Sequence, residues 1–404
     1  MSGPAVEVTG LGVVSSAGLS VAEFERAILS GKCTIGDISD RADGLRYTVG
    51  APVRAFEPEK YFDEKSLGLL DRFSQFAAVA AREAVTEARL SEGSTKAERI
   101  GVIIGTANGG IDILTEGYLR ITQGKKPRPL TVPMTMASAP ASRIAHETGA
   151  RGPVFGISSA CASAAHAVVV GLTLIRAGLI DVAIVGGTDS CFCRGYLTAW
   201  DGLRTVSPDT CRPFSINRRG LVIGEGAAIL ILERAGRATT RGARPIAKLI
   251  GAGMTSDAGD LMAPDYRGMM QAMRQAMADG GIDPAAVDYI NAHGTGTVAN
   301  DRAEARAIRE IFDSQSDVVS VSSTKSMIGH AMGASGALEA VATIVALTKG
   351  IIPPTVNYLG VDPECDIDVT PNVARAKDVH AALSNSFAFG GLNVSLAFLS
   401  AAAH

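Results

Sequence analysis

The chain has 404 residues, of which 47% are hydrophobic and 20% are charged, and its formal net charge at pH 7 is -3. This composition indicates a globular chain long enough for two domain-sized cores or one fused core. The small net charge argues against a general nucleic-acid or membrane-surface binder. No segment has the pattern of a signal peptide, and charged side chains interrupt the most apolar region, residues 164–187, so we expect a cytoplasmic protein without a membrane span.

Hydrophobic periodicity predicts alternating strands and helices through the first half of the chain. After a short buried strand that begins at Val154, a turn of small residues leads into a long apolar helix that ends near Ala177. Residues 117–140 are rich in Pro, Lys, Thr and Met, which predicts an irregular excursion. The other strands are expected over residues 6–14, 100–105, 181–187 and 227–232, and the other helices over residues 21–30 and 67–88.

A similar order of elements returns after residue 249. Strands are expected over residues 246–253, 287–292, 318–323 and 382–398, the last broken at Gly390 and Gly391, and helices over residues 266–279 and 337–348. The two halves have little sequence similarity, but the order of their elements is alike. We therefore expect two similar α/β halves, residues 1–249 and 250–404, with converging turns. Active sites in such sheets lie at the strand ends.

Cys161 lies in the strand-to-helix turn of the first half. Unpaired N–H groups and the positive end of the helix dipole favour a thiolate at such a place, and small neighbours allow a substrate carbonyl to approach. A buried, inert thiol is the alternative for this segment taken alone. The six cysteines do not form a disulfide framework, and those at 191, 193 and 211 lack the spacing of a zinc site.

His293 and His330 stand in small-residue turns of the second half, at places that match the turn of Cys161. A single histidine in a turn is more often a structural hydrogen-bonding group than a catalyst. Two histidines at matching turns of a duplicated fold that also supplies a cysteine favour catalysis. A metal site is the alternative, but the three residues occur singly on separate elements without a paired ligand motif, so we expect none.

Four motifs support a resemblance that covers essentially the whole chain. They are Ser159–Ser163, His293–Thr297, Lys325–Gly336 and Asn385–Asn393. In this order and near these spacings, the sequence resembles the β-ketoacyl-acyl-carrier-protein synthases, the elongating condensing enzymes of the thiolase superfamily. The resemblance implies an α/β fold of the thiolase-like, duplicated, five-layer α/β/α/β/α type, usually dimeric.

The resemblance also implies a decarboxylative Claisen condensation. Cys161 would take an acyl chain from a carrier-protein thioester. His293 and His330 would bind the thioester carbonyl of a malonyl-acyl-carrier-protein as carbon dioxide leaves, and N–H groups of Cys161 and Phe389 would form the oxyanion hole. The further roles implied are polar support by Lys325 and Glu339, a gate at Phe389, and a pantetheine tunnel lined by Thr295 and Thr297.

Two further regions follow from the same resemblance. The acyl pocket would present Asn108 and Thr131, and an acidic acyl carrier protein would meet Lys65, Arg72 and Arg204 beside the tunnel mouth. The partner subunit would be a second copy or a chain-length-factor-like subunit. No cofactor is expected beyond the phosphopantetheine that the carrier protein brings.

Departures from the common family pattern concern the pathway. Ser215 and Arg219 stand where acidic residues are usual, and Ala388 and Leu392 replace the glycine and threonine usual in the gating loop. They favour a ketosynthase of a discrete-subunit (type II) polyketide pathway of the reducing or polyene kind. Ordinary fatty-acid elongation is the alternative. A third hypothesis, a non-catalytic chain-length partner subunit, is disfavoured because such a subunit usually lacks the cysteine.

Overall fold

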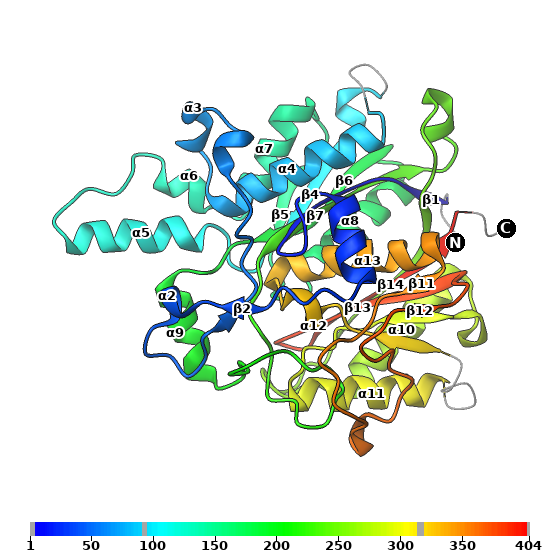
Figure 1. Cartoon of the computed structure of the whole chain (residues 1–404). Coiled ribbons are helices and arrows are strands. Elements are labelled where there is room, and N and C mark those ends of the chain that lie inside the picture. The colour runs from blue at the N-terminus through cyan, green and yellow to red at the C-terminus, as the bar shows by residue number, and fades with distance from the viewer. Residues whose placement is uncertain (1–4, 91–94, 313–318, 402–404) are drawn as a thin grey trace.

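The computed structural model describes residues 5–90, 95–312 and 319–401. Within these residues one sheet of ten strands runs through the molecule (Figure 1). The first half of the chain contributes β1 (Val6–Ser15), β4 (Ile100–Gly105), β5 (Val154–Ile157), β6 (Val182–Asp189) and β7 (Gly226–Arg234). The second half contributes β8 (Ala247–Ser256), β9 (Tyr289–Asn291), β10 (Ser320–Ser322), β13 (Ala381–Ala388) and β14 (Leu392–Ser400).

The strand order is the same in both halves. It is β5-β4-β6-β7-β1 in the first half and β10-β9-β13-β14-β8 in the second. If the five strands of each half are numbered along the chain, both halves have the order third, second, fourth, fifth, first. Strand directions also agree, since β4 is parallel to β5 and β6 as β9 is to β10 and β13, while β7 and β14 are antiparallel to both of their neighbours. The weak sequence repeat therefore corresponds to a duplicated fold.

The two halves of the sheet meet at β1 and β8, which pair over a short stretch that includes Val6 and Leu249. The predicted boundary between residues 249 and 250 falls inside β8. β8 belongs wholly to the second half, because it takes there the position that β1 takes in the first.

Two helices form the central layer. They are α8 (Ser163–Arg176), which follows the Cys161 turn, and α13 (Ser335–Lys349), which follows the His330 turn. Each contacts strands of both halves, and they contact one another. The side chains of α13 are buried from Ser335 to Leu347, as expected for a helix that is apolar on all sides. Because each of these helices follows a site-bearing turn, the central layer brings the two turns together.

Outer helices complete the five layers. α4 (Arg72–Glu87) and α7 (Ala139–Thr148) cover the first half of the sheet, and α10 (Tyr266–Gly280) and α11 (Val298–Phe312) cover the second. In Figure 1 these two pairs lie on opposite sides of the molecule. The predicted helix over residues 67–88 begins later, at Arg72, because the carboxylate of Asp71 accepts from the N–H of Phe73 and caps α4 there.

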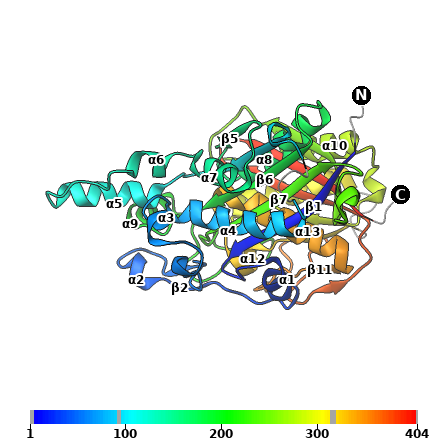
Figure 2. The ribbon, with the colours of Figure 1, turned by 90° about the horizontal axis from the view of Figure 1, so that it is seen from above.

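The predicted irregular excursion is partly helical. It contains the end of α5 (Ile111–Thr122) and α6 (Thr131–Thr135), which project from the body as an arm (Figures 1 and 2). The shorter elements are α1 (Val21–Leu29), α2 (Ser39–Ala42), α3 (Glu64–Leu67), α9 (Arg194–Leu203), α12 (Lys325–Ile328), β2 (Gly36–Asp37), β3 (Val49–Gly50), β11 (Ile351–Ile352) and β12 (Arg375–Ala376).

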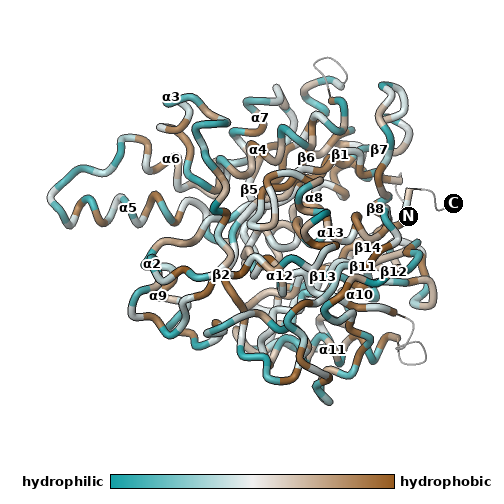
Figure 3. Tube along the Cα trace, in the orientation of Figure 1, coloured by the Kyte–Doolittle hydropathy of each residue, from teal (hydrophilic) through white to brown (hydrophobic). Residues whose placement is uncertain are grey.

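Hydrophobic residues gather in the middle of the molecule, and hydrophilic ones are frequent on its outer helices and loops (Figure 3). Among the described residues, no helix is both long enough and apolar enough to cross a membrane. The apolar region at residues 164–187 is instead α8 and β6, buried between the layers.

Candidate active site

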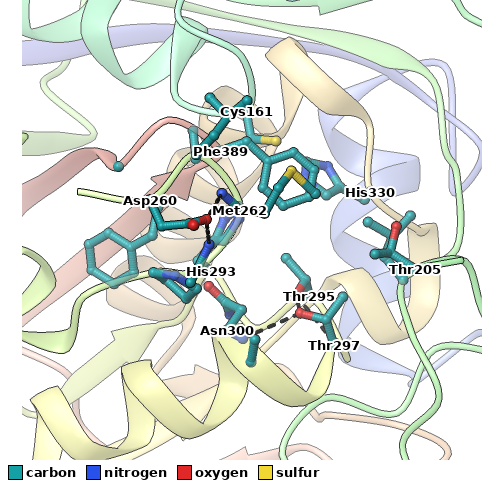
Figure 4. Close-up of a pocket in the computed structure, with 18 of the residues that line it drawn as sticks. Cys161, Thr205, Asp260, Met262, His293, Thr295, Thr297, Asn300, His330 and Phe389 are labelled. Atoms are coloured by element: carbon teal, nitrogen blue, oxygen red, sulfur yellow. Dashed lines mark hydrogen bonds between the residues drawn. The ribbon is translucent and has the colours of Figure 1, made fainter. Parts of the chain in front are cut away.

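One cavity receives side chains from both halves of the chain (Figure 4). The first half supplies Cys161, and the second supplies His293, His330 and Phe389. The Cys161 sulfur and one nitrogen of each imidazole ring lie within 4.8 Å of one another. The two imidazole rings stand edge to face, with centroids 5.4 Å apart. The duplicated fold therefore converges on one cysteine and two histidines.

Close backbone packing fixes the turn that carries Cys161. A Cβ atom on Gly105, at the end of β4, would lie 2.3 Å from the carbonyl carbon of Ser163, so only glycine fits there. The Ser163 hydroxyl accepts from the N–H of Ser159 at 2.9 Å and donates to the carbonyl of Ala160 at 2.6 Å. Cys161 is thus held just ahead of α8, with 8% of its surface exposed.

The resting state of Cys161 differs from the sequence-based expectation. Burial raises the pKa of its thiol to about 12, although the Lys325 ammonium acts in the opposite direction. Desolvation of the charged form is the largest cause, and it opposes the thiolate that the helix dipole was expected to favour. The raised pKa favours the thiol over the thiolate in the free enzyme.

Hydrogen bonds define the tautomer of both histidines. The N–H of Met332 donates to Nδ1 of His330 at 3.0 Å, so this nitrogen carries a lone pair. The Lys325 ammonium lies 3.3 Å from Nδ1 of His293 and has only protons to offer it. In each ring the proton is therefore on Nε2.

Both rings are neutral. Burial and then the positive charge of Lys325 lower the pKa of His293 and of His330 well below 6.5. A neutral imidazole with its proton on Nε2 is a hydrogen-bond donor without a charge. Two such donors in one cavity suit an oxygen atom that becomes negative during a reaction.

Lys325 and Glu339 lie behind His293, buried in the second half. The Lys325 ammonium donates to the carbonyl of His293 at 2.7 Å and to the carboxylate of Glu339. Burial raises the pKa of Glu339 to about 7 even though Lys325 opposes the rise. The pair connects α12 and α13 to the His293 loop, which is the polar support that the resemblance implied.

The same three side chains have the spacing of a metal site, but their hydrogen bonds do not fit one. A histidine that binds metal through Nε2 has a proton on Nδ1, which it donates to a carboxylate or carbonyl. Here Nδ1 of His330 faces an N–H and Nδ1 of His293 faces an ammonium. The rings are therefore arranged to donate from Nε2.

Two acidic residues of α11 hold the His293–Thr297 loop, and the sequence analysis missed both. Glu304 accepts from the N–H groups of His293 and Gly294, each at 2.8 Å. Asp301 accepts from the N–H of Gly296 at 3.2 Å. Their spacing of three positions directly after the loop was the available indication, since such residues share one helix face.

A buried carboxylate at the end of β6 was also missed. Asp189 accepts from the hydroxyl of Thr106 at 2.8 Å and from the N–H groups of Ala107 and Gly333 at 2.9 and 2.6 Å. It therefore joins the loop after β4 to the segment between His330 and α13. Nothing in the local sequence predicts this role, because its partners come from distant parts of the chain.

Phe389 lies between the cavity and a cluster of aromatic residues. Its ring stacks on Trp200, with centroids 6.1 Å apart and an interplanar angle of 27°. Gly390 and Gly391 follow with φ of 82° and 68°, values that other residues rarely adopt. The N–H of Gly390 donates to the carbonyl of Leu261 at 2.9 Å. The role of Phe389 as a gate remains a prediction.

The structure brings most of the predicted cavity residues together. Thr295 and Thr297 line the cavity, with their hydroxyl oxygens 2.8 Å apart. The N–H groups of Cys161 and Phe389 donate to no other group within the described ranges, which leaves both available to a substrate oxygen. The role in an oxyanion hole remains a prediction.

Asn108 and Thr131 do not line this cavity. Asn108 lies beside Tyr196, whose hydroxyl group its side chain approaches. Thr131 stands on the projecting arm, where its methyl group approaches Gly117 of α5. The acyl-pocket roles of both residues remain predictions.

The predicted carrier-binding residues divide into two kinds. Lys65 and Arg204 are exposed on the surface. Arg72 is instead largely internal, since its guanidinium pairs with Glu225 at 3.1 Å and lies over the ring of Phe76 at 4.6 Å. The carrier-binding role of Arg72 stays a prediction, for a side chain whose charge is paired with a buried carboxylate.

Comparisons with known proteins agree over nearly the whole chain. Residues 4–238 match the family described as "Beta-ketoacyl synthase, N-terminal domain", and residues 246–359 match its C-terminal domain. Nodulation protein E of Rhizobium sp. is 44% identical, covering 97% of this chain and 98% of that protein. The 3-oxoacyl-[acyl-carrier-protein] synthase 2 of Synechocystis sp. is 39% identical, with 97% of each chain covered.

Solved structures are similar over the same extent. "The ishigamide ketosynthase/chain length factor" has a TM-score of 0.94 and 34% identity, covering 98% of this chain and 99% of that chain. A type II polyketide synthase acyl-carrier protein in complex with its ketosynthase has a TM-score of 0.91 and 30% identity, covering 98% and 100%. With its duplicated fold and its convergent cysteine and histidines, the chain belongs to the β-ketoacyl synthases, a family of acyltransferase-class condensing enzymes with the thiolase-like fold.

Proposed function

We propose that this chain elongates a polyketide by decarboxylative Claisen condensation of a malonyl-acyl-carrier-protein with an acyl chain held on Cys161. The observation that carries the proposal is the cavity in which the Cys161 thiol meets the Nε2–H groups of His293 and His330. A nucleophile and two neutral donors are the groups that such a reaction needs.

The first step is acyl transfer. The Cys161 sulfur attacks the carbonyl carbon of the incoming thioester, and the bond between that carbon and the pantetheine sulfur breaks. The Cys161 proton leaves with the pantetheine thiol. Because the pKa of Cys161 is raised to about 12, proton loss must accompany attack, and the free enzyme keeps an unreactive thiol.

The second step is loss of carbon dioxide from the malonyl thioester. The electron pair of the broken bond moves to the thioester, where the oxygen becomes negative as an enolate forms. The Nε2–H groups of His293 and His330 donate to this oxygen. Lys325 and the N–H of Met332 hold the two rings in the donating tautomer.

The third step forms the carbon–carbon bond. The enolate carbon attacks the carbonyl carbon of the acyl group on Cys161, whose oxygen would be held by the N–H groups of Cys161 and Phe389. Collapse of this intermediate breaks the bond to the Cys161 sulfur. The expelled thiolate takes up one proton from solvent, which restores the thiol that its raised pKa favours, and the β-ketoacyl product remains on the carrier protein.

The pathway we propose is a type II polyketide pathway of the reducing or polyene kind. Ser215, Arg219, Ala388 and Leu392 support it because they depart from the pattern of housekeeping enzymes. The structural similarity to an ishigamide ketosynthase and to a type II polyketide ketosynthase also supports it. Fatty-acid elongation is the second candidate, favoured by the 39% identity to a 3-oxoacyl synthase.

The partners we propose are an acyl carrier protein and a second subunit of the same fold. A ketosynthase with its carrier protein and another with its chain length factor are among the similar structures. The second subunit would be another copy or a chain-length-factor-like protein. Phosphopantetheine would arrive with the carrier protein as part of the substrate, and no metal or other cofactor is required.

Mass spectrometry of carrier-bound products tests the proposal. The chain is incubated with malonyl carrier protein and candidate primers, alone and with a co-encoded homologous subunit. We expect β-ketoacyl products on the carrier and a matching release of carbon dioxide. If neither β-ketoacyl products nor carbon dioxide release is seen with any primer or subunit, the condensing activity is refuted. If the chain accepts saturated primers alone, fatty-acid elongation is favoured.

A further inference from the structure

A second hollow opens beside the active-site cavity. It measures about 220 Å³, and Trp200 lines both hollows. Three arginines, Arg46, Arg204 and Arg219, line this second hollow together with Asp201. We call it the arginine groove. It lies at the end of α9, outside the catalytic residues.

Two short segments lead from the arginine groove into the cavity. Arg204 lines the groove, and the next residue, Thr205, lines the cavity; Arg219 lines the groove, and Leu221 lines the cavity. The N–H of Leu221 donates to the carbonyl of Thr205 at 2.9 Å, which holds the segments side by side. The groove therefore adjoins the cavity that contains Cys161, and we call these two neighbouring hollows together the passage.

The arginine groove carries excess positive charge. Asp201 forms a salt bridge with Arg46 at 3.1 Å. Neither Arg204 nor Arg219 forms a salt bridge with any residue that the structure describes, and both are exposed. Three guanidinium groups against one carboxylate leave two positive charges for a ligand.

The backbone around Arg219 is firmly placed. A Cβ atom on Gly220, whose φ is 134°, would lie 2.2 Å from the carbonyl oxygen of Thr205, so glycine is required there. The N–H of Gly220 donates to the carbonyl of Gly296 at 3.1 Å, which ties this segment to the Thr295–Thr297 loop. On the other side, Arg218 is buried and bonded to Asp362. Within residues 218–220, Arg219 is therefore the one whose side chain can meet a ligand.

The cavity part of the passage offers hydroxyl groups, and the carboxylate of Asp260 in its lining already accepts from the N–H groups of Met262 and Ala263. Thr295 and Thr297 line the cavity, and Thr205 contributes a buried hydroxyl that has no partner in the described residues. A buried hydroxyl without a partner costs free energy, which a ligand amide or hydroxyl would recover. The passage thus suits an uncharged polar arm that ends in an anion at the arginine groove.

We propose that Arg219, together with Arg204, binds the phosphodiester of the phosphopantetheine arm while its thioester reaches Cys161. This inference rests on the proposed function. It adds the residues that bind the arm at its phosphate, the end farthest from Cys161. Between thioester and phosphate that arm is uncharged, with amide and hydroxyl groups, which matches the passage. A guanidinium group can donate two parallel hydrogen bonds to a phosphate.

Three acyl donors distinguish a contact of Arg219 with the phosphate from a contact with the carrier protein. They carry one acyl group on the carrier protein, on free phosphopantetheine and on pantetheine without phosphate, and acylation of Cys161 is followed by mass spectrometry. Arg219→Gln should raise KM roughly tenfold for the first two donors, because each has the phosphate. It should leave the pantetheine donor within about twofold. Arg219→Lys should recover part of the loss, and Arg274→Gln, an exposed arginine of α10, is the matched control.

Two results would overturn the inference. Equal loss with all three donors would mean that Arg219 only supports the local structure. Loss with the carrier protein alone would mean that Arg219 meets acidic side chains of the carrier and not the phosphate. Calorimetric binding of free phosphopantetheine needs no acyl transfer. It should weaken in Arg219→Gln even if the proposed condensation itself proved wrong, so the two proposals fail separately.

Discussion

Replacing His330 by alanine tests the reading of the two histidines as neutral donors. His330 accepts the N–H of Met332 on Nδ1 at 3.0 Å, so its Nε2–H points to the cavity that also holds Cys161. Loss of one donor to a developing oxyanion costs about 2.7–4 kcal/mol of transition-state stabilisation, or roughly 100-fold to 1,000-fold in rate. We expect a fall of that size in carbon dioxide release from malonyl carrier protein.

The assay follows two half-reactions separately. Carbon dioxide release reports the decarboxylation, and mass spectrometry of the protein reports the acylation of Cys161. His330→Ala should retain measurable acylation, because the thiol proton can leave with the pantetheine thiol. His330→Gln, which keeps an N–H donor, should recover part of the decarboxylation, and the exposed His380→Ala is the control. Unchanged decarboxylation in His330→Ala, or equal loss in both half-reactions, would refute the assigned role.

The same variant has a pH signature. Burial and Lys325 lower the pKa of His330 well below 6.5 in the folded state, whereas the unfolded chain binds a proton near pH 6.5. Below that pH the unfolded state holds the extra proton, so the free energy of unfolding falls as the pH falls, by at most about 1.4 kcal/mol per unit for this group. Denaturant titrations between pH 7 and 5 should show a shallower fall in His330→Ala.

Further substitutions have distinct expected outcomes. Cys161→Ala should abolish condensation, since no acyl-enzyme can form, and normal product in a mass-spectrometric assay would contradict the assignment. Lys65→Glu should raise KM for the carrier protein mainly at low salt, and a KM independent of salt would exclude steering by this exposed charge. Asn108→Phe should shorten the products without affecting alkylation of Cys161 by iodoacetamide, whereas an unchanged product distribution would place the acyl pocket elsewhere. Arg72→Met leaves Glu225 buried and unpaired, so the free energy of unfolding should drop by roughly 3 kcal/mol, and a drop below about 0.5 kcal/mol would show that the pair is unimportant.

The sequence by itself determined the order of elements and the reacting residues. The predicted strand over residues 100–105 coincides with β4, and the predicted helix over residues 266–279 differs from α10 by one residue. Such elements follow from hydrophobic periodicity, which is local and therefore visible in the chain. Cys161, His293 and His330 could be selected because each stands in a small-residue turn at the end of a strand.

Only the tertiary structure decided how charges and protons are distributed. Arg72 and Glu225 are 153 positions apart, and their contact pairs with a buried carboxylate a cation that the sequence analysis had treated as a free surface charge. The thiol form of Cys161 results from burial between layers contributed by both halves. The tautomers of His293 and His330 depend on single donors, Lys325 and the N–H of Met332, whose positions follow from packing. These properties depend on distance and desolvation, which a linear pattern of residue types does not encode.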